Sequence, residues 1–398
     1  MGKNIVIVGA GIAGLNAAKA ARDNDKNCNI ILLGIENTNT YTRTRIPHYI
    51  SGEATLNEIM PYNDQWYINN KITFLKNTKV IDIDAISKKV ITDKDSYDYD
   101  FLVLASGSSP FKPSIKGIEL DNVLTIRSIN DADIVKELSK KRKICTVIGG
   151  GLLGLEIAWS VKQLGCDVNI IEHNPRLLPR QTDEECSALL LDSIEEKGMK
   201  VHLNAETEEF IGKEKIQQVK LKDGRIVDTD FVILSTGVRP NVSAFLNVGL
   251  DIGRAIKVNE YMETNIDGIY AAGDVAEYNG KNYCIWPISV SQGKIAGSNA
   301  AGGRITYDDM KPHTQLKIKG ISLFTIGDVF CESCNVFHFL DKKSKKYIKF
   351  LLKDNIITGA IIFGEPSLSM KVKKAVENRT VLSSPSSSDN IDELIKLL

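Results

Sequence analysis

Gly9-Ala-Gly11-Ile-Ala-Gly14 directly follows the apolar run from Ile5 to Val8. A second copy of the pattern, Gly149-Gly-Gly151-Leu-Leu-Gly154, follows the run from Thr146 to Ile148. The first glycine of such a pattern allows a tight turn, the second lets backbone approach a pyrophosphate, and the third lets a helix pack close to its strand. The free N–H groups of that helix bind the phosphates. The chain is therefore predicted to bind two dinucleotides.

The sequence around each copy supports this interpretation. Each copy opens a helix-like run, Leu15 to Arg22 in the first and Leu155 to Leu164 in the second. A second apolar strand then follows, Asn29 to Leu33 and Asp167 to Ile171 respectively. A glycine pattern alone is weak evidence, but strand, turn, helix and strand in this order are typical of a dinucleotide-binding unit.

A carboxylate near the end of the second strand, roughly 20 residues beyond the glycines, hydrogen-bonds the ribose in such units. Glu172 has this position in the second copy, and Glu36 is the nearest acid in the first. The carboxylate of Glu172 would repel a 2′-phosphate, which favours NADH over NADPH. Arg176 and Arg180 follow closely and, turned inward, would weaken that preference.

Three more segments complete an ordered set of motifs. Leu102-Val-Leu-Ala-Ser106-Gly107 and Val232-Ile-Leu-Ser-Thr236-Gly237 are apolar strands that lie at similar distances behind the two glycine patterns. The segment from Thr264 to Ala276 then delivers Gly273 and Asp274. The set resembles the glutathione-reductase-like pyridine nucleotide:disulfide oxidoreductase superfamily, in which an NADH domain interrupts an FAD domain. The resemblance implies an α/β fold with two Rossmann-like domains, FAD at the first copy and NADH at the second.

The resemblance also assigns individual residues. Glu156 would contact the nicotinamide carboxamide; the alternative is an exposed acid in the first helical turn. Trp286-Pro287 would open a helix whose N-terminus faces the flavin, or Trp286 is ordinary core, and Lys317 would reach toward the flavin. The expected cofactor-binding residues are Gly9, Gly11, Ala13, Gly14, Glu36, Arg43, Ser106, Gly107, Gly149, Gly151, Gly154, Glu156, Glu172, Gly237, Gly273, Asp274, Trp286 and Lys317.

The stretch after the first acidic strand, Asn39-Thr-Tyr41-Thr-Arg43-Thr-Arg45-Ile-Pro47-His48-Tyr49, has no cysteine. Disulfide-reducing members of the superfamily carry one there. This stretch is similar instead to members that pass electrons to a separate carrier, in particular NADH:rubredoxin oxidoreductases. Arg43 and Arg45, together with Glu156, are the candidate catalytic residues, because an arginine near the flavin would stabilise its reduced, anionic form. The alternative for both arginines is a pair of solvated loop cations, and His48 is interpreted as structural.

The seven cysteines are an odd number, scattered mostly through apolar segments, which indicates reduced thiols. Cys331-Glu-Ser-Cys334 has the spacing of a redox pair or half of a zinc site, yet only His338 is near it. We interpret it as a turn between strands, and we predict no metal site.

Composition limits the class of protein. Lys plus Arg and Asp plus Glu are 50 each, so no net charge favours nucleic acid or an anionic membrane. No apolar run reaches about 18 residues, and the first residues lack a signal-peptide pattern. A cytoplasmic protein, monomeric or homodimeric, is expected.

The motif order predicts FAD-binding residues 1–110 and 241–305, an NADH-binding domain at 111–240 and a small α+β domain at 306–398. The last should contain strands Ile318 to Ile326, Asn335 to Leu340, Tyr347 to Leu352 and Ile356 to Phe363, a loop from Ser383 to Asp389, and a helix from Ile391 to Leu398.

Two lysine clusters in this last domain, 342–346 and 371–374, are either solvated faces or a docking surface for a small acidic carrier such as rubredoxin. The predicted activity is hydride transfer from NADH to FAD, followed by single-electron transfer to that carrier. The alternatives are a reductase for ferredoxin, flavoprotein or nitrite-reductase partners, an NADH oxidase, and a non-catalytic flavoprotein that senses NADH.

Overall fold

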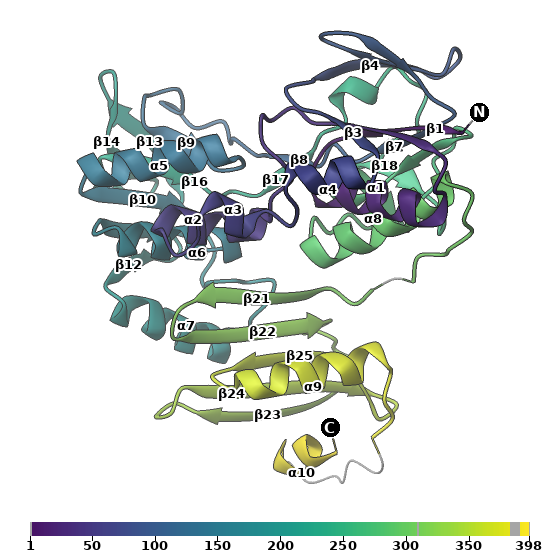
Figure 1. Cartoon of the computed structure of the whole chain (residues 1–398). Coiled ribbons are helices and arrows are strands. Elements are labelled where there is room, and N and C mark those ends of the chain that lie inside the picture. Colours follow the sequence, from purple (N-terminus) through teal and green to yellow (C-terminus); the bar gives the residue numbers. More distant parts are fainter. Residues whose placement is uncertain (1, 309, 383–390, 398) are drawn as a thin grey trace. The chain divides into compact units, whose positions relative to one another are not determined.

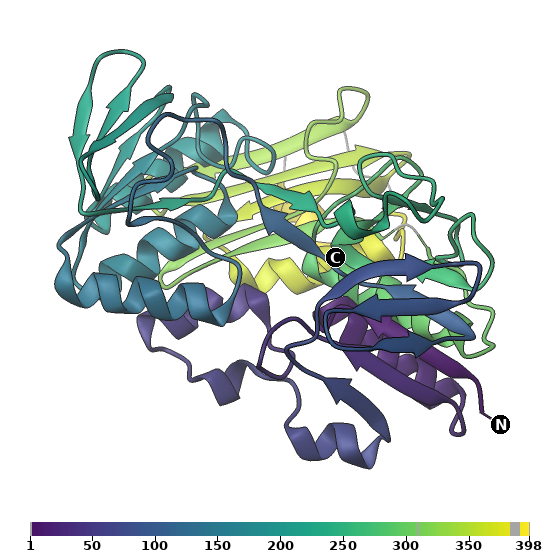
Figure 2. The same cartoon turned by 90° about the horizontal axis from the view of Figure 1, so that it is seen from above.

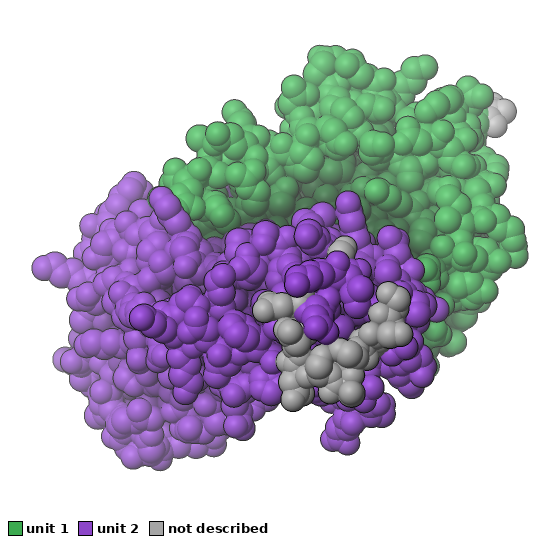
Figure 3. Space-filling model, turned by 90° about the horizontal axis from the view of Figure 1, so that it is seen from below, with its two compact units in different colours: residues 1–109, 237–309 green, residues 110–236, 310–398 purple. Residues whose placement is uncertain are grey.

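The computed structural model describes residues 2–308, 310–382 and 391–397. The chain divides into two compact units, the first made of residues 1–109 and 237–309 and the second of residues 110–236 and 310–398 (Figure 3). Each unit therefore combines two separate stretches of sequence. Within the described residues, no helix is both long and apolar enough to cross a bilayer.

Unit 1 is built on a parallel sheet whose central strand is the first apolar run of the chain. This strand, β1 (Asn4–Val8), lies in the order β19-β7-β1-β2-β3. Ile5, Val6 and Ile7 are fully buried, as expected where both faces of a parallel sheet are covered. Its partners are β2 (Asn29–Leu33), β3 (Ile72–Leu75), β7 (Phe101–Leu104) and β19 (Ile269–Ala271).

Two helices of unit 1, α1 (Ile12–Asn24) and α8 (Trp286–Ala300), lie side by side (Figure 1). Glycines on α8 permit this approach, because a Cβ on Gly293 or Gly297 would overlap the backbone of α1. The second stretch of unit 1 thus packs directly on the helix that follows the first glycine pattern.

The rest of unit 1 consists of short elements. The antiparallel β4-β5-β6 sheet lies near the N-terminus in Figure 2. The strands are β4 (Val80–Asp84), β5 (Lys89–Thr92), β6 (Ser96–Asp98), β8 (Ser108–Pro110), β17 (Val238–Pro240), β18 (Ile256–Val258) and β20 (Ala276–Tyr278). The helices are η1 (Arg43–Arg45), α2 (Ile46–Ser51), α3 (Leu56–Ile59), α4 (Asp64–Asn69), η2 (Ser243–Phe245) and η3 (Gly273–Val275).

Unit 2 repeats the parallel-sheet plan around the second apolar run. Its central strand is β10 (Ile144–Ile148), in the order β12-β11-β10-β16-β9. Around it lie β9 (Val123–Thr125), β11 (Asp167–Ile171), β12 (Met199–His202), β13 (Thr207–Gly212), β14 (Ile216–Leu221), β15 (Ile226–Asp228), β16 (Phe231–Leu234), α5 (Ile129–Lys141), α6 (Leu152–Gln163) and α7 (Glu184–Glu196). The prediction of two Rossmann-like folds and a small mixed domain is confirmed.

The C-terminal part of unit 2 is an antiparallel sheet with the order β21-β22-β25-β24-β23. Helix α9 covers one face through Leu368, Val372 and Val376 (Figure 1). The elements are β21 (His313–Ile318), β22 (Ile321–Gly327), β23 (Asn335–Asp341), β24 (Lys346–Lys353), β25 (Ile356–Phe363), α9 (Pro366–Glu377) and α10 (Ile391–Lys396).

The predicted single strand from Ile318 to Ile326 is wrong at its start. The chain turns at Gly320, whose φ of +82° suits glycine, so Ile318 ends β21 and Ile321 begins β22. The predicted loop from Ser383 to Asp389 lies outside the described residues.

Asp183 connects the C-terminal sheet to the parallel sheet of unit 2. It caps α7 by accepting a hydrogen bond from the N–H of Cys186 at 3.1 Å. The Tyr347 hydroxyl and the Lys349 ammonium, both on β24, donate to the same carboxylate at 2.5 and 2.9 Å. These three bonds hold the pKa of Asp183 below its ordinary value, although burial alone would raise it.

Candidate functional site

The first glycine pattern forms a backbone cradle at the start of α1. Gly9 has a φ of +108°, and a Cβ there would overlap the carbonyl oxygen of Ala105. A Cβ on Gly14 would overlap the carbonyl oxygen of Gly9, whereas one on Gly11 would meet nothing within 4 Å. The first and third glycines are thus required by packing, and the second borders open space.

The second glycine pattern has the same geometry. Gly149 has a φ of +114° and faces the carbonyl of Ser235, and a Cβ on Gly154 would overlap the carbonyl oxygen of Gly149. Gly151 again borders space with no atom within 4 Å of a Cβ. Two unrelated stretches of chain therefore leave the same backbone position open.

The helices that follow the two cradles begin without a side-chain cap. Gly11 and Gly151 are the N-cap residues of α1 and α6, and neither helix has an acidic residue in its first turn. Helices α3, α4, α5 and α7 are capped by side chains, namely those of Thr55, Asn63, Ser128 and Asp183, whereas α2, α8 and α9 are not. Uncapped N–H groups at the positive end of a helix suit an anionic ligand. Both cradles therefore fit the pyrophosphate of a dinucleotide.

Gly273 and Asp274 lie beside the first cradle. A Cβ on Gly273 would come within 2.8 Å of the Cβ of Ala13, so Ala13 packs against this turn. The hydroxyl groups of Ser108 and Ser289 donate to the two carboxylate oxygens of Asp274, at 2.6 and 3.2 Å. The predicted Gly-Asp motif thus meets the first glycine pattern within unit 1.

Helix α8 begins at Trp286 in the same region. Its N-cap residue, Ile285, makes no side-chain cap, and Gln292 accepts the N–H of Gly273 at 2.9 Å. Trp286 is partly exposed, which does not fit the alternative of an ordinary core residue.

Ser106 and Asn241 connect the two stretches of unit 1. The Ser106 hydroxyl donates to the Asn241 carbonyl, and the Asn241 side chain donates to the Ser106 carbonyl, both at 3.0 Å. Gly107 follows with a φ of +71°, and Gly237, after β16, has a φ of +95°.

Glu36 pairs with Tyr41 and Arg43. One carboxylate oxygen accepts the Tyr41 hydroxyl at 2.7 Å, and the other accepts the Arg43 guanidinium at 2.6 Å. Burial alone would lower the pKa of Arg43, but the attraction of Tyr41 and Glu36 outweighs burial and raises it. Arg43 therefore remains a cation beside the first cradle, where Asp274 also contributes to its field.

Arg45 turns to a different partner. Its guanidinium donates to the carbonyl oxygen of Glu58 at 2.8 Å, at the end of α3. His48 Nε2 lies 3.9 Å from the Glu53 carboxylate. The two arginines that were both predicted as candidate catalytic residues thus contact different parts of unit 1.

Glu172 is buried at the end of β11 and fixes the second cradle. Its carboxylate accepts the N–H of Gly150 at 2.6 Å, and it accepts the backbone and side-chain N–H groups of Asn174 at 2.8 and 2.7 Å. The carboxylate predicted to bind ribose is therefore also the group that holds the glycine loop in place.

Glu156 is buried on α6, with 7 % of its surface exposed. Desolvation raises its pKa to about 7, against the opposing effects of the Lys317 N–H and of the Lys317 charge. That N–H, on β21, donates to Glu156 Oε1 at 2.8 Å. The alternative of an exposed first-turn acid is wrong. Lys317 itself is exposed.

The buried Glu156 should make stability depend on pH. Its carboxyl is neutral in the folded state up to about pH 7, whereas in the unfolded chain it ionises near its ordinary value of 4.5. Between these pH values the folded state binds more protons, so the free energy of unfolding should fall as pH rises, by up to about 3 kcal/mol from this group. Glu156→Gln should remove that dependence, as measured by urea denaturation at pH 5 and pH 8 without NADH. Equal pH profiles for the two proteins would contradict the assignment.

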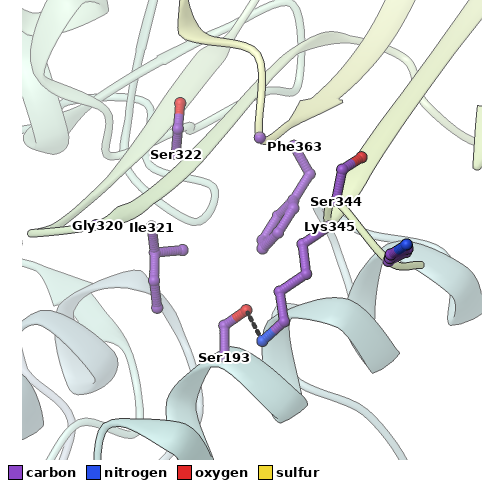
Figure 4. A pocket seen from close by; sticks show the side chains of 9 residues that line it. Ser193, Gly320, Ile321, Ser322, Ser344, Lys345 and Phe363 are labelled. Atoms are coloured by element: carbon purple, nitrogen blue, oxygen red, sulfur yellow. Dashed lines mark hydrogen bonds between the residues drawn. The ribbon is translucent and has the colours of Figure 1, made fainter. Parts of the chain in front are cut away.

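A hollow lies elsewhere in unit 2, between α7 and the C-terminal sheet (Figure 4). Its volume is about 510 Å³, and Lys345 Nζ meets Ser193 Oγ at its wall at 3.5 Å. It contains no residue of either cradle, and we assign the chemistry to the cradles because they carry the anion-binding geometry.

The cysteines correct one expectation. Cys331 and Cys334 form a disulfide in the turn between β22 and β23, so the prediction of reduced thiols is wrong for this pair. The other five cysteines form no disulfide, and four of them are buried. The described residues contain no group of three or more His, Cys, Asp or Glu side chains arranged to hold a metal ion.

Sequence reasoning missed Ser108 and Ser289, which both bind Asp274. Ser108 lies 166 residues from Asp274, and nothing in the local sequence predicts that contact. Ser289 occupies the first turn of α8, a position that could have been suspected from the predicted approach of that helix to the cofactor.

Comparison with known proteins matches both parts of the chain. The family model described as pyridine nucleotide-disulphide oxidoreductase matches residues 3–293. The model described as rubredoxin NAD+ reductase C-terminal domain matches residues 312–380.

Individual relatives agree with these matches. The chain is 34 % identical over 388 residues to a nitrite reductase [NAD(P)H] of Bacillus subtilis, covering 96 % of this chain but only 48 % of that one. It thus spans about half the length of that relative, and the same holds for an assimilatory nitrate reductase electron transfer subunit of the same organism. It is 33 % identical to an NADH-rubredoxin oxidoreductase of Clostridium acetobutylicum, covering 99 % of this chain and 98 % of that one.

Solved structures show the same fold. The crystal structure of NADH:rubredoxin oxidoreductase from Clostridium acetobutylicum superimposes with a TM-score of 0.82 at 31 % identity, covering all of both chains. A covalent putidaredoxin reductase–putidaredoxin complex superimposes with a TM-score of 0.89 over 99 % of this chain and 97 % of that one. At 24 % identity the second likeness concerns the fold alone.

Proposed function

Because the chain belongs to the pyridine nucleotide-disulphide oxidoreductase family, an FAD- and NADH-dependent group of enzymes, we propose that it passes electrons from NADH to a small iron–sulfur carrier, with rubredoxin as the favoured acceptor. The observation that carries this proposal is the pair of open, uncapped glycine cradles at Gly11 and Gly151. Bound FAD supplies two-electron hydride acceptance and one-electron release.

In this proposal the residues of unit 1 bind the flavin dinucleotide. The N–H groups of α1 hold its pyrophosphate, and Asp274 accepts hydrogen bonds from its sugar-like chain. Arg43 balances negative charge on the ligand, and Glu36 keeps the arginine in place. The open end of α8 at Trp286 adds a positive partial charge that favours an electron-rich ring.

Residues of unit 2 bind and orient the donor. The N–H groups of α6 hold the pyrophosphate of NADH, and Glu172 accepts a ribose hydroxyl through the one lone pair, on Oε2, that its loop contacts leave available. Glu156, neutral below about pH 7, presents its carboxyl to the nicotinamide carboxamide. The hydrogen bond from the β21 backbone positions this carboxyl, so the C-terminal domain helps to build the coenzyme site.

The sequence near the first cradle favours transfer of electrons from the flavin to a separate carrier protein. The stretch 39–49 holds no cysteine, so the thiol that disulfide-reducing relatives use is missing there. A second candidate is electron supply to a nitrite-reductase module, which the 34 % identity to the longer Bacillus subtilis relative favours.

The experiment that separates these functions is reoxidation of the reduced protein. The purified protein is reduced anaerobically with NADH, and rubredoxin, ferredoxin, a nitrite-reductase module and oxygen are then offered in turn. Fastest reoxidation by rubredoxin supports the main proposal. Reoxidation by oxygen alone would indicate an oxidase, and no reoxidation by any acceptor would indicate a sensor.

In the lysine cluster 342–346, two of the four lysines are engaged in ion pairs, so the exposed positive surface is smaller than the sequence predicts. Lys345 pairs with Glu196 at 2.5 Å, and Lys346 pairs with Glu365 at 2.8 Å. Lys342 and Lys343 are exposed beside them. These two lysines are the part of the cluster that we propose for docking an acidic carrier.

Charge reversal should test this docking surface. Lys342→Glu with Lys343→Glu is expected to lower kcat/KM for rubredoxin about 10-fold at low salt, because long-range attraction speeds association. The difference from wild type should shrink toward 1 M salt, where the Debye length falls to about 3 Å. Lys94→Glu, an exposed lysine in unit 1, is the control. A wild-type kcat/KM for rubredoxin that does not change with salt concentration would contradict the proposed docking surface.

A further inference from the structure

The turn that carries the disulfide presents an aromatic ring. Residues 328–334 connect β22 to β23, and the Cys331–Cys334 bond closes the end of this turn. Phe330, next to the disulfide, leaves 44 % of its surface exposed, which is high for a phenylalanine that serves only the core. The turn therefore holds an apolar side chain outside the core of its own sheet.

The ring of Phe330 lies against Arg176. The guanidinium carbon is 6.0 Å from the ring centroid, within the reach of a cation–π contact. Arg176 also donates to the carbonyl oxygens of Thr182 and Pro179, at 3.2 and 3.4 Å. Two kinds of contact thus hold this arginine against the loop that follows β11.

That loop is where a dinucleotide-binding unit distinguishes its two coenzymes. Arg176 lies four residues beyond Glu172, at the end of the second strand of the unit. An acid there binds the 2′-hydroxyl of NADH, and an arginine nearby accommodates the 2′-phosphate of NADPH. The chain carries both residue types, so the direction in which Arg176 points affects which coenzyme binds.

The surroundings of the contact are acidic. A hollow of about 310 Å³ is lined by Arg176, Phe330 and three acids, Asp183, Glu184 and Glu185. Asp183 is occupied by Tyr347 and Lys349, and Glu185 Oε2 lies 4.0 Å from His338 Nε2, so Glu184 and Glu185 add negative charge to this wall at the start of α7. The negative charge of this wall favours an arginine that stays on this side of its loop over one that turns toward a phosphate.

We propose that Phe330, presented by the disulfide-closed turn, is a positioning residue for coenzyme specificity. It holds Arg176 against its own loop, away from the adenine ribose, and so favours NADH over NADPH. The inference rests on the proposed function in one respect, namely that the second cradle binds a nicotinamide dinucleotide.

The disulfide makes this contact sensitive to thiols. A thiolate of a small thiol attacks one sulfur and forms a mixed disulfide, and a second thiol resolves it. Two electrons and two protons pass to Cys331 and Cys334, and the two thiols leave as one disulfide. An open turn holds Phe330 less firmly, so reduction should shift specificity in the same direction as removal of the ring.

The test measures binding of NADH and NADPH by calorimetry, under anaerobic conditions and with the flavin already reduced, so that no hydride is transferred during the titration. Phe330→Ala should reduce the preference for NADH, expressed as the ratio of the two dissociation constants, about 2- to 5-fold, the range of one exposed cation–π contact. In an Arg176→Ala background the same substitution should have no effect on the ratio. Phe339→Ala, a phenylalanine of similar exposure on β23, is the matched control and should leave the ratio unchanged.

The presence and the role of the disulfide are tested separately. Thiol titration of the unfolded protein should find five thiols before reduction and seven after it. The pair Cys331→Ser with Cys334→Ser should shift the ratio as Phe330→Ala does, and Cys284→Ser should not. Dithiothreitol should reproduce the shift in the wild type and have no effect on the serine pair.

The possible outcomes distinguish the positioning role of Phe330 from the role of the disulfide. An unchanged ratio in Phe330→Ala, or an equal change when Arg176 is absent, overturns the positioning role while both coenzymes still bind. Seven thiols before reduction overturn the role of the disulfide. Failure of the wild type to bind either coenzyme overturns the proposed function as well.

Discussion

Gly151→Asp should abolish NADH oxidation while the protein stays folded and retains its flavin. Gly151 is the N-cap of α6, has extended backbone angles, and leaves a Cβ in open space, so an aspartate fits without overlap. The aspartate would cap the helix and stabilise it by about 0.3–1 kcal/mol. The same carboxylate would occupy the N–H groups that bind pyrophosphate and repel its charge by roughly 4 kcal/mol at 4 Å. NADH binding should weaken about 100-fold or more.

Two measurements check this separation of folding from binding. Thermal denaturation should show an unchanged or slightly raised Tm, and calorimetry should show the loss of NADH affinity. Gly151→Ala, which adds a methyl group without charge to the same space, should weaken NADH binding less than Gly151→Asp does, so the difference measures the effect of the charge. A Gly151→Asp protein that binds NADH normally would rule out the second cradle as the pyrophosphate site.

Gly11→Asp should produce the reciprocal defect, a folded protein that has lost its flavin. Gly11 caps α1 with the same extended backbone and the same open space. The new carboxylate would compete with the flavin dinucleotide for the N–H groups of α1. We expect a colourless protein, with loss of all NADH-dependent electron transfer, that still binds NADH at the second cradle.

The absorbance spectrum after purification and after incubation with excess FAD measures this loss, and calorimetry with NADH serves as the internal control. If the variant remained yellow and lost NADH binding instead, the assignment of the two cradles would have to be exchanged. The two aspartate variants thus test the order of the cofactors along the chain as well as their sites.

The sequence was most informative where the structure is local. Each glycine pattern, its preceding strand and its following helix lie within about 20 residues, so the roles of Gly9 and Gly14 could be inferred from spacing. Glu172 was found for the same reason, since it ends the second strand of its unit.

Sequence reasoning was least informative where distant segments meet. Glu156 accepts a hydrogen bond from β21, a strand that was not predicted from the sequence, since the predicted strand began at Ile318 and ran through the turn at Gly320. The bond between Ser108 and Asp274 joins residues 166 positions apart. Arg43 and Arg45 were both candidates for a cation near the flavin, yet the short 3₁₀ helix that carries them directs the two side chains to different partners.

Unit 1 is built from two separate stretches of sequence, which affects the order in which the chain folds during synthesis. The edge strand β19 and the helix α8 complete the core of unit 1, but they come from residues 269–300. Residues 110–236 are synthesised before them and contain all five strands of a second parallel sheet. We therefore expect the parallel sheet of unit 2 to fold on the nascent chain first. At that point β1, β2, β3 and β7 of unit 1 still lack their last partner strand, β19. The paired hydrogen bonds between Ser106 and Asn241 would then close the insertion only after both of its ends have emerged.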